Sequence, residues 1–196
     1  MFEMEGFILT GGKSSRMGTD KARLRLGSES FTEKIAAALS SVSRSVRLVG
    51  GQAQSGVWEI VPDAHKEWGA LGGLHAALCA CRSEWAAIVA CDLPFVTGKL
   101  FLRLADLRQN FDAVIPIQAD NRPQPLCALY RPNVCLSAVE GLIAAGEHRP
   151  RLLLERVSAR RVAYAELADL KAAELFFNNV NTPEDYAHAR AVVADE

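Results

Sequence analysis

The sequence predicts one α/β domain with a mostly parallel sheet. Short apolar segments alternate along the chain with segments whose apolar residues recur at helical spacing. Such alternation favours parallel strands that are joined by right-handed helical crossovers. The chain has 196 residues and carries no internal repeat, low-complexity tract or linker, so we expect a single domain over 1–196.

Strands are expected where short apolar runs end in turn residues, and helices where the apolar spacing is three or four. The most apolar run, Trp85 to Cys91, indicates a strand that is buried on both faces. Ligands bind beyond the carboxyl ends of strands in such sheets, which directs attention to the residues after Thr10, Val61, Cys91 and Tyr130. The predicted strands are 6–10, 45–49, 58–61, 85–91, 112–117 and 126–130. The predicted helices are 31–39, 71–81, 100–107, 133–145 and 183–193.

Composition excludes several classes of protein. Twenty-two Lys and Arg against 23 Asp and Glu give a formal charge of −1, which argues against a dedicated nucleic-acid binder. No segment approaches the ~18 apolar residues of a membrane span, and the acidic N-terminus is unlike a signal peptide. We therefore expect a cytoplasmic protein without membrane partners. Five cysteines fit reduced thiols, and Cys79 and Cys81, on nearly opposite faces of a predicted helix, favour packing over a metal site.

A glycine-rich, basic loop follows the first predicted strand. It contains Gly11, Gly12 and Gly18, whose backbone N–H groups can approach a ligand closely, together with Arg16 and Lys21, which can neutralise a polyphosphate. The spacing matches neither the P-loop nor the dinucleotide fingerprint. A flexible surface turn is the alternative interpretation, but three glycines and several cations directly after a strand favour an anion site.

Two aspartates stand where strands are expected to end. Asp92 follows the apolar strand at 85–91 and is well placed to hold Mg²⁺ against nucleotide phosphates. Asp63 follows the strand at 58–61 and is placed to bind the metal, the nucleotide sugar or its own loop. The alternative for each is a turn or helix-capping residue, and for Asp63 the two interpretations are evenly matched.

Four blocks of the sequence together resemble the molybdenum cofactor guanylyltransferases, also called molybdopterin-guanine dinucleotide synthases. The first is Leu9-x-Gly-Gly-x-x-x-Arg-Met-Gly-x-Asp-Lys21. The others are Gly69-Ala-Leu-Gly-Gly-Leu74, Ala90-Cys-Asp-Leu-Pro94 and Asn179-Val-Asn-Thr-Pro-Glu184, in the family's order. The first and last blocks are specific to this family, whereas the middle two are shared with other nucleotidyltransferases.

The resemblance implies a fold, a reaction and a set of residues. The fold is the Rossmann-like, three-layer nucleotide-diphospho-sugar transferase fold. The reaction is Mg²⁺-dependent transfer of GMP from GTP to molybdenum–molybdopterin, with release of pyrophosphate. By position, the implied nucleotide-binding residues are Leu9, Thr10, Gly11, Gly12, Lys21, Asp63 and Asp92. Among these, Asp63 would contact the guanosine and Asp92 would also be the metal ligand. The implied catalytic residues are Arg16, Lys21 and Asp92.

Three positions depart from the family pattern. Thr10 stands where Ala is usual, which a backbone contact tolerates. Ala70 replaces a usual Pro, so that loop gains freedom. Gly50-Gly51-Gln52 stands where Asn often contacts the nucleotide, and we assign no contact there.

The sequence indicates the acceptor-binding residues less clearly than the nucleotide-binding residues. Asn179 and Asn181 are candidates to bind the pterin or to cap the final helix, where Thr182 and Pro183 fit the N-cap and first helical positions. Five arginines between Gly146 and Arg161 fit either an acceptor-phosphate site or a solvated surface.

Other functions stay open at this stage. They are a related nucleotidyltransferase that uses CTP or a sugar phosphate, and a nucleotide-binding partner of cofactor insertion without catalysis. Molybdoenzymes or insertion proteins are the expected protein partners.

Overall fold

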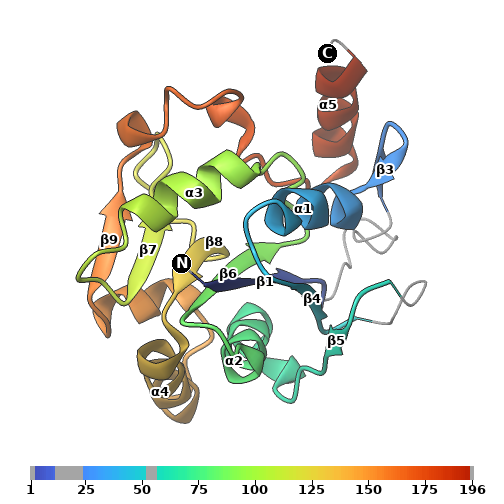
Figure 1. The fold of residues 1–196 in the computed structure, drawn as a ribbon. Helices are drawn as coiled ribbons and strands as arrows, with labels where there is room; N and C mark the ends of the chain where they lie inside the picture. The colour runs from blue at the N-terminus through green and yellow to red at the C-terminus, as the bar shows by residue number, and fades with distance from the viewer. Residues whose placement is uncertain (1–2, 12–23, 52–56, 195–196) are drawn as a thin grey trace.

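The chain forms a seven-stranded sheet between two layers of helices (Figure 1). The computed structural model describes residues 3–11, 24–51 and 57–194. The strand order in this part of the chain is β5-β4-β1-β6-β8-β7-β9, and every neighbouring pair is parallel except the two pairs that contain β8. The strands are β1 Met4–Leu9, β4 Val46–Val49, β5 Ile60–Val61, β6 Trp85–Ala90, β7 Ala113–Pro116, β8 Cys127–Tyr130 and β9 Ala159–Val162.

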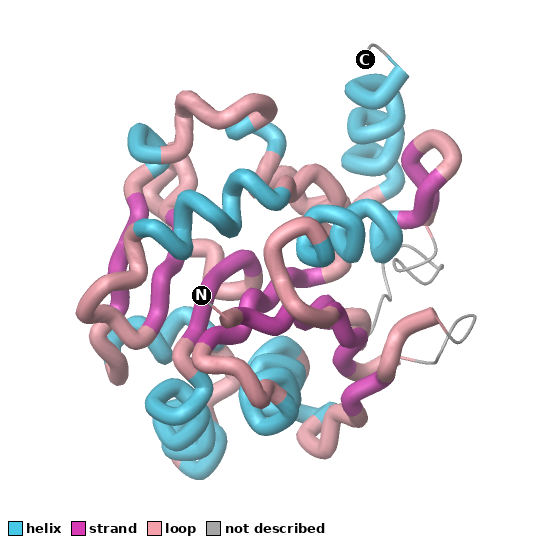
Figure 2. Tube along the Cα trace, in the orientation of Figure 1, coloured by secondary structure: helices cyan, strands magenta, loops and turns pink. Residues whose placement is uncertain are grey.

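Helices cover both faces of the sheet (Figure 2). The helices α1 (Phe31–Ser40) and α3 (Gly98–Asp106) pack on one face, and α2 (Ala70–Ala80) and α4 (Pro132–Ala144) pack on the other. Two large hydrophobic clusters fill the space between the sheet and these two helical layers. The expectation of a three-layer α/β fold with a mostly parallel sheet is therefore confirmed.

The central strands are buried on both faces, as their apolar sequence predicts. Every residue of β1 is buried, including the charged Glu5. Its carboxylate pairs with Arg47 of β4 and accepts hydrogen bonds from the Arg82 backbone N–H (3.3 Å) and the Ser83 hydroxyl (3.2 Å). Arg47 also donates to the carbonyl oxygen of Ala80 (2.8 Å). A buried charge needs such partners, and these lie at the amino end of the sheet, away from the predicted site.

The direction of β8 corrects one expectation. Tyr130 pairs with Ala86 at the start of β6, so the chain after Tyr130 lies at the opposite edge of the sheet from the carboxyl ends of β1 and β6. A parallel connection needs a crossover of about a dozen residues or more. The segment 117–126 between β7 and β8 is shorter and folds back on itself, with Asn121 at a φ of 65° and an isolated bridge between Ile117 and Pro123. This loop, rather than the chain after Tyr130, reaches the predicted binding edge.

A small third cluster lies at one corner of the molecule. We call it the corner core; it consists of Leu26, Phe31, Val180 and Ala189, with Leu24, Phe95, Tyr186 and Val193 packed around them. It joins a two-stranded hairpin, β2 (Arg25–Leu26) and β3 (Glu29–Ser30), to the start of α1 and to α5 (Pro183–Ala194). Ser30 caps α1 in a capping box with Glu33, whose carboxylate accepts from the Ser30 N–H (2.6 Å).

Most predicted elements are found within a few residues of their expected ends, and all five predicted helices are present. The strand expected at 58–61 shortens to β5, while β9 lies inside the arginine-rich segment and was not predicted. Single 3-10 turns fill much of the remainder: η2 Lys66–Trp68, η3 Pro150–Glu155, η4 Tyr164–Glu166 and η5 Ala173–Leu175. In the part of the chain that the structure describes, no helix is long and apolar enough to cross a bilayer.

Candidate active site

The candidate active site lies at the carboxyl ends of β1, β4, β5 and β6. These four strands are neighbours and run parallel, so the loops that follow them meet at one edge of the sheet. The loops carry Thr10 and Gly11, Gly50 and Gly51, Asp63, and Asp92. Ligands bind at this edge in open α/β sheets, so the fold brings together the residues that the sequence singled out there.

The loops after β1 and β4 touch each other through glycines. Gly50 has a φ of 70°, and a Cβ atom added to it would lie 3.1 Å from the Cα of Gly11. Gly51 also has a φ of 70°, and its added Cβ would lie 2.8 Å from the Thr10 hydroxyl. Only glycine adopts this backbone readily and permits such an approach. Gly50 and Gly51 therefore belong to the candidate site. The sequence signal for them is a pair of glycines directly after a predicted strand.

Thr10 fastens these two loops together. Its N–H donates to the carbonyl oxygen of Val49 (2.9 Å), and its hydroxyl lies 3.1 Å from the carbonyl oxygens of both Val49 and Gly50. The Gly50 N–H in turn donates to the carbonyl oxygen of Val61 (3.0 Å). The Thr10 side chain thus bonds within the protein. Leu9, the residue before it, is buried, and a Cβ on Gly73 of α2 would meet its side chain at 3.5 Å.

Replacing Thr10 with Ala should therefore change activity little. The variant loses one hydroxyl hydrogen bond, which costs about 1 kcal/mol of stability, but keeps the backbone N–H that holds the loop. Denaturant unfolding and initial rates of nucleotidyl transfer measure the two effects, with Thr10→Ser as the control that keeps the hydroxyl. A tenfold or larger loss of kcat/KM for the nucleotide in Thr10→Ala alone would contradict this and place the hydroxyl on the ligand.

Asp63 is partly exposed and lies beside this glycine floor. A Cβ atom added to Gly50 would lie 3.9 Å from the Cβ of Asp63. Its Oδ1 accepts a hydrogen bond from the N–H of His65 (2.8 Å), which is the turn role that the sequence also allowed. The first turn of α2 packs against this turn, because a Cβ on Gly72 would lie 3.1 Å from the same Oδ1. Asp63 therefore shapes its loop at the site, and a contact with guanosine stays a prediction.

Asp92 has the most unusual environment of the site residues. Its Oδ1 is buried and has no hydrogen-bond partner among the described residues. Its backbone is held firmly, because its carbonyl oxygen accepts from the N–H of Val180 (2.9 Å), and the preceding Cys91 N–H donates to Leu9 (3.1 Å). A buried carboxylate oxygen without a donor is costly unless a cation or a ligand satisfies it.

The residues present at Asp92 fit a magnesium ion. Mg²⁺ in nucleotide enzymes is commonly held by one or two carboxylates, with substrate phosphates and water completing the octahedron. One unsatisfied carboxylate oxygen at the nucleotide edge supplies that kind of ligand. Within the described ranges, at Asp92 or elsewhere, no group of three or more His, Cys, Asp or Glu side chains is arranged to hold a metal ion, so substrate phosphates and water would supply the other ligands. Cys79 is exposed rather than packed in the core and lies 3.6 Å from His75 Nε2, which corrects the packing interpretation for that thiol.

Residues 12–23 of the glycine-rich loop lie outside the described residues. They include Gly12, Gly18, Arg16 and Lys21, of which the sequence assigns Gly12 and the two cations to nucleotide binding or catalysis. The described chain stops at Gly11, at the site, and resumes at Leu24 beside the corner core.

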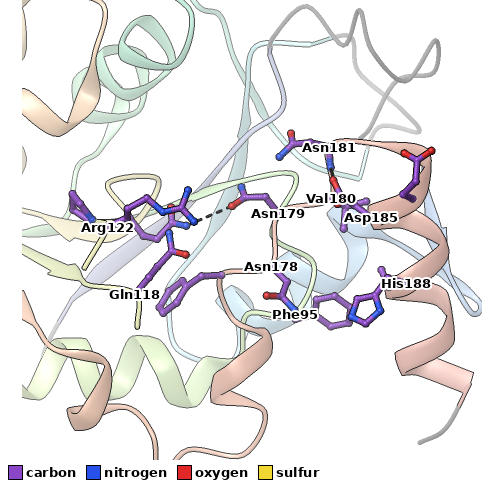
Figure 3. A pocket seen from close by; sticks show the side chains of 14 residues that line it. Phe95, Gln118, Arg122, Asn178, Asn179, Val180, Asn181, Asp185 and His188 are labelled. Carbon is purple, nitrogen blue, oxygen red and sulfur yellow. Dashed lines mark hydrogen bonds between the residues drawn. The ribbon is translucent and has the colours of Figure 1, made fainter. Parts of the chain in front are cut away.

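A cavity of about 810 Å³ is lined in part by Val180, whose N–H donates to the carbonyl oxygen of Asp92 (2.9 Å). It is formed between the 117–126 loop, the segment before α5, and α5 itself (Figure 3). Side-chain amides dominate its polar lining: Gln118, Gln124, Asn178, Asn179 and Asn181. Gln124 Nε2 of the loop lies 3.5 Å from Asn179 Oδ1 of the segment before α5, so this pair bridges the two. Asn179 and Asn181 are thus brought to one cavity.

The segment before α5 is also capped, as the sequence predicts. The Thr182 hydroxyl accepts from the N–H of Asp185 (3.1 Å). The Asp185 carboxylate accepts from the N–H groups of Asn181 and Thr182 (2.9 Å each), which sequence reasoning missed. A carboxylate three residues after a Thr N-cap is the signal of such a reciprocal cap. The Asn181 backbone therefore has a structural role while its side chain lines the cavity.

Two arginines of the arginine-rich segment 146–161 form ion pairs in different parts of the fold. Arg149 pairs with Glu147 (2.8 Å), and Arg160 of β9 pairs with Glu166. None of its five arginines lines the amide-rich cavity; the cation there is Arg122, which is held by Asp120 (2.6 Å). The pKa of Asp120 lies below its usual range, although desolvation opposes this, because its oxygens accept hydrogen bonds from Arg122. A solvated surface is the better interpretation for Arg149 and Arg160.

Comparison with known proteins identifies the family of the chain. Residues 6–162 match the MobA-like NTP transferase domain. The chain is 33% identical to a protein of Pelotomaculum thermopropionicum over 98% of this chain and 94% of that one, and 35% identical to a protein of Deinococcus radiodurans over 95% and 94%. Each of these carries the name "Probable molybdenum cofactor guanylyltransferase".

A solved structure has the same fold. The molybdopterin-guanine dinucleotide biosynthesis protein A of Archaeoglobus fulgidus superimposes with a TM-score of 0.83 at 24% identity, covering 98% of this chain and 100% of that one. The family model over residues 6–162 and the full-length sequence relatives therefore show that the chain belongs to the MobA-like NTP transferase family, together with relatives named as probable molybdenum cofactor guanylyltransferases.

Proposed function

We propose that this chain transfers GMP from GTP to molybdenum–molybdopterin, forming the molybdopterin guanine dinucleotide cofactor and pyrophosphate. One structural observation carries the proposal. The backbone around Asp92 links the two parts of the site, because the Cys91 N–H donates to the Leu9 carbonyl oxygen (3.1 Å) before the glycine loop and the Asp92 carbonyl oxygen accepts from Val180 (2.9 Å) in the wall of the amide-lined cavity, while the buried Asp92 Oδ1 has no hydrogen-bond partner among the described residues. A nucleotidyl transfer needs this layout, with two polyanionic substrates meeting at one cation-binding carboxylate. The names of the sequence relatives support the choice of substrates.

The reaction is an in-line displacement at the α-phosphorus of GTP. An oxygen of the acceptor's terminal phosphate forms the new P–O bond, the bond between the α-phosphorus and the bridging oxygen breaks, and pyrophosphate leaves with the electron pair. A phosphate monoester has its second pKa near 6, so the nucleophile is already largely anionic at neutral pH and requires no strong general base. Catalysis of this kind is chiefly positioning and charge neutralisation.

The chain's residues divide this work between them. The backbone of Thr10, Gly11, Gly50 and Gly51 forms the surface on which the nucleotide rests, and Asp63 sets the adjoining turn. Gly12, Arg16 and Lys21, which lie outside the described residues, are proposed to bind the phosphates. Asp92 is proposed to hold Mg²⁺, which when bound would offset the negative charge of the triphosphate and the leaving group. Asn179 and Asn181 are proposed to bind the acceptor by hydrogen bonds.

The experiment combines the protein, Mg²⁺, molybdopterin and α-labelled nucleotide. Label from GTP, and not from CTP, should move into a pterin dinucleotide in an amount equal to the pyrophosphate released. Transfer from CTP alone would keep the mechanism and overturn the base assignment. Absence of transfer from either would contradict the proposal, and transfer to a phospho-sugar would then identify the related enzyme class.

The destination of the product is a further part of the proposal. A dinucleotide cofactor must pass to a molybdoenzyme or to a protein that inserts it, so we expect such partners in the cytoplasm. Copurification of a molybdoenzyme with the wild-type chain, but not with a chain that lacks transfer activity, tests whether handover depends on bound product.

A further inference from the structure

The corner core connects three segments that bear on the proposed reaction. Leu26 lies just beyond the glycine-rich loop, Phe95 lies three residues beyond Asp92, and Val180 lies between the two cavity asparagines. Tyr186 of α5 strengthens the connection, because its hydroxyl donates to the carbonyl oxygen of Arg25 (2.7 Å). The nucleotide side and the acceptor side of the site therefore share one small packed unit.

Val180 makes the direct link within this unit. Its N–H donates to the carbonyl oxygen of Asp92 (2.9 Å), and its side chain is only 2% exposed among the apolar residues of the corner core. On either side of it, Asn179 and Asn181 are partly exposed and line the cavity, as Figure 3 shows. A β-branched side chain has restricted rotation about χ1, so a buried valine defines its backbone position sharply.

We propose that Val180 is a positioning residue that fixes the distance between the acceptor-binding asparagines and the Asp92 carboxylate. The backbone hydrogen bond sets the register, and the buried side chain prevents the segment from sliding out of it. The proposal rests on the transfer reaction proposed above. A displacement of about 1 Å between reacting groups can cost about 100-fold in rate, so a loosened segment should be visible in the kinetics.

The test separates position from stability with three valine variants. Val180→Ala removes the side chain that anchors the segment. Val180→Thr keeps its shape but buries a hydroxyl, which is destabilising although the volume hardly changes. Val139→Ala makes the same truncation in the fully buried core of α4, away from the site. Asn181→Ala serves as the reference for direct loss of an acceptor contact. Each variant is assayed for KM of GTP, KM of molybdopterin, kcat and melting temperature.

Val180→Ala should lower kcat/KM for molybdopterin by about tenfold or more, chiefly by raising KM for molybdopterin, while KM for GTP stays within twofold, a pattern like that of Asn181→Ala. Val180→Thr should melt earlier yet keep KM for molybdopterin near the wild-type value. Val139→Ala should melt earlier with both KM values unchanged.

Three results overturn the inference, and they are distinguishable. If wild type transfers GMP but Val180→Ala shows only the stability loss of Val139→Ala, Val180 is merely a core residue and the proposed function stands. If Val180→Thr raises KM for molybdopterin as much as Val180→Ala does, the effect follows stability and the positioning role fails. A wild type that transfers nothing overturns the proposed function itself, and this inference with it.

Discussion

Asp92→Asn should reduce nucleotidyl transfer by at least about 100-fold, the loss typical of removing one electrostatic stabiliser of a transition state. The substitution keeps the shape of the side chain and removes its charge. In the described structure the buried Oδ1 receives no hydrogen bond, so the folded protein loses little when the carboxylate becomes an amide. A metal-binding role predicts this combination of a large kinetic loss and an almost unchanged stability.

The measurement is the initial rate over a titration of Mg²⁺, together with thermal unfolding of the same samples. Asp169→Asn is the matched control, because Asp169 is an exposed partner of Arg103 on the surface, where ion pairs contribute little. The control should keep its rate and its dependence on Mg²⁺. Turnover of Asp92→Asn near the wild-type rate would show that the metal assignment is wrong.

Gly72→Ala should destabilise the protein and weaken nucleotide binding together. A Cβ atom at this position would lie 2.1 Å from the carbonyl oxygen of His65 and 2.9 Å from its carbonyl carbon, both backbone atoms. Either the first turn of α2 or the Asp63 turn must move. Overpacking of this kind costs about 1–3 kcal/mol, and in a protein of this size each kcal/mol lowers the melting temperature by about 2–4 °C.

The adjacent glycine supplies the control for this variant. A Cβ on Gly73 would meet only the side chain of Leu9, at the ordinary contact distance of 3.5 Å. Ala is favoured over Gly within a helix by about 1 kcal/mol, so Gly73→Ala should be neutral or stabilising. Melting curves and GTP titrations compare the two variants. Equal losses in both would mean that helix composition, rather than the contact with His65, determines the effect.

Sequence patterns predicted the helices and most parallel strands because local periodicity and burial agree along them. The direction of β8 was not predicted, because its apolar sequence is compatible with either orientation and only the short 117–126 connection indicates a reversal. Strand β9 was not predicted for another reason. Arg160 and Arg161 look like a solvated surface, yet β9 is an edge strand whose residues are mostly accessible to water.

The candidate site was predicted unevenly. Asp92 was identified because a carboxylate directly after a buried strand must lie at the binding edge. Gly50 and Gly51 were left unassigned because the Asn usual in the family is absent there, and their close approach to Thr10 and Gly11 appears only in the folded chain. Asp185 was missed although a carboxylate three residues after Thr182 is the pattern of a reciprocal cap. The roles of Gly12, Arg16 and Lys21 stay predictions.

The reversed strand β8 has a consequence for how the acceptor side can change. Hydrogen bonds to neighbouring strands secure both ends of the connecting loop, because the N–H of Ala90 in β6 donates to the carbonyl oxygen of Leu126 (2.8 Å) and the N–H of Ile117 donates to that of Val162 in β9 (2.8 Å). The loop itself contributes Gln118, Arg122 and Gln124 to the cavity lining and is not a strand of the sheet. Hairpin loops tolerate insertion and exchange far better than central strands do. Exchange of the 117–126 loop alone should therefore change the preference for the proposed acceptor, while the strands and loops on the nucleotide side stay the same.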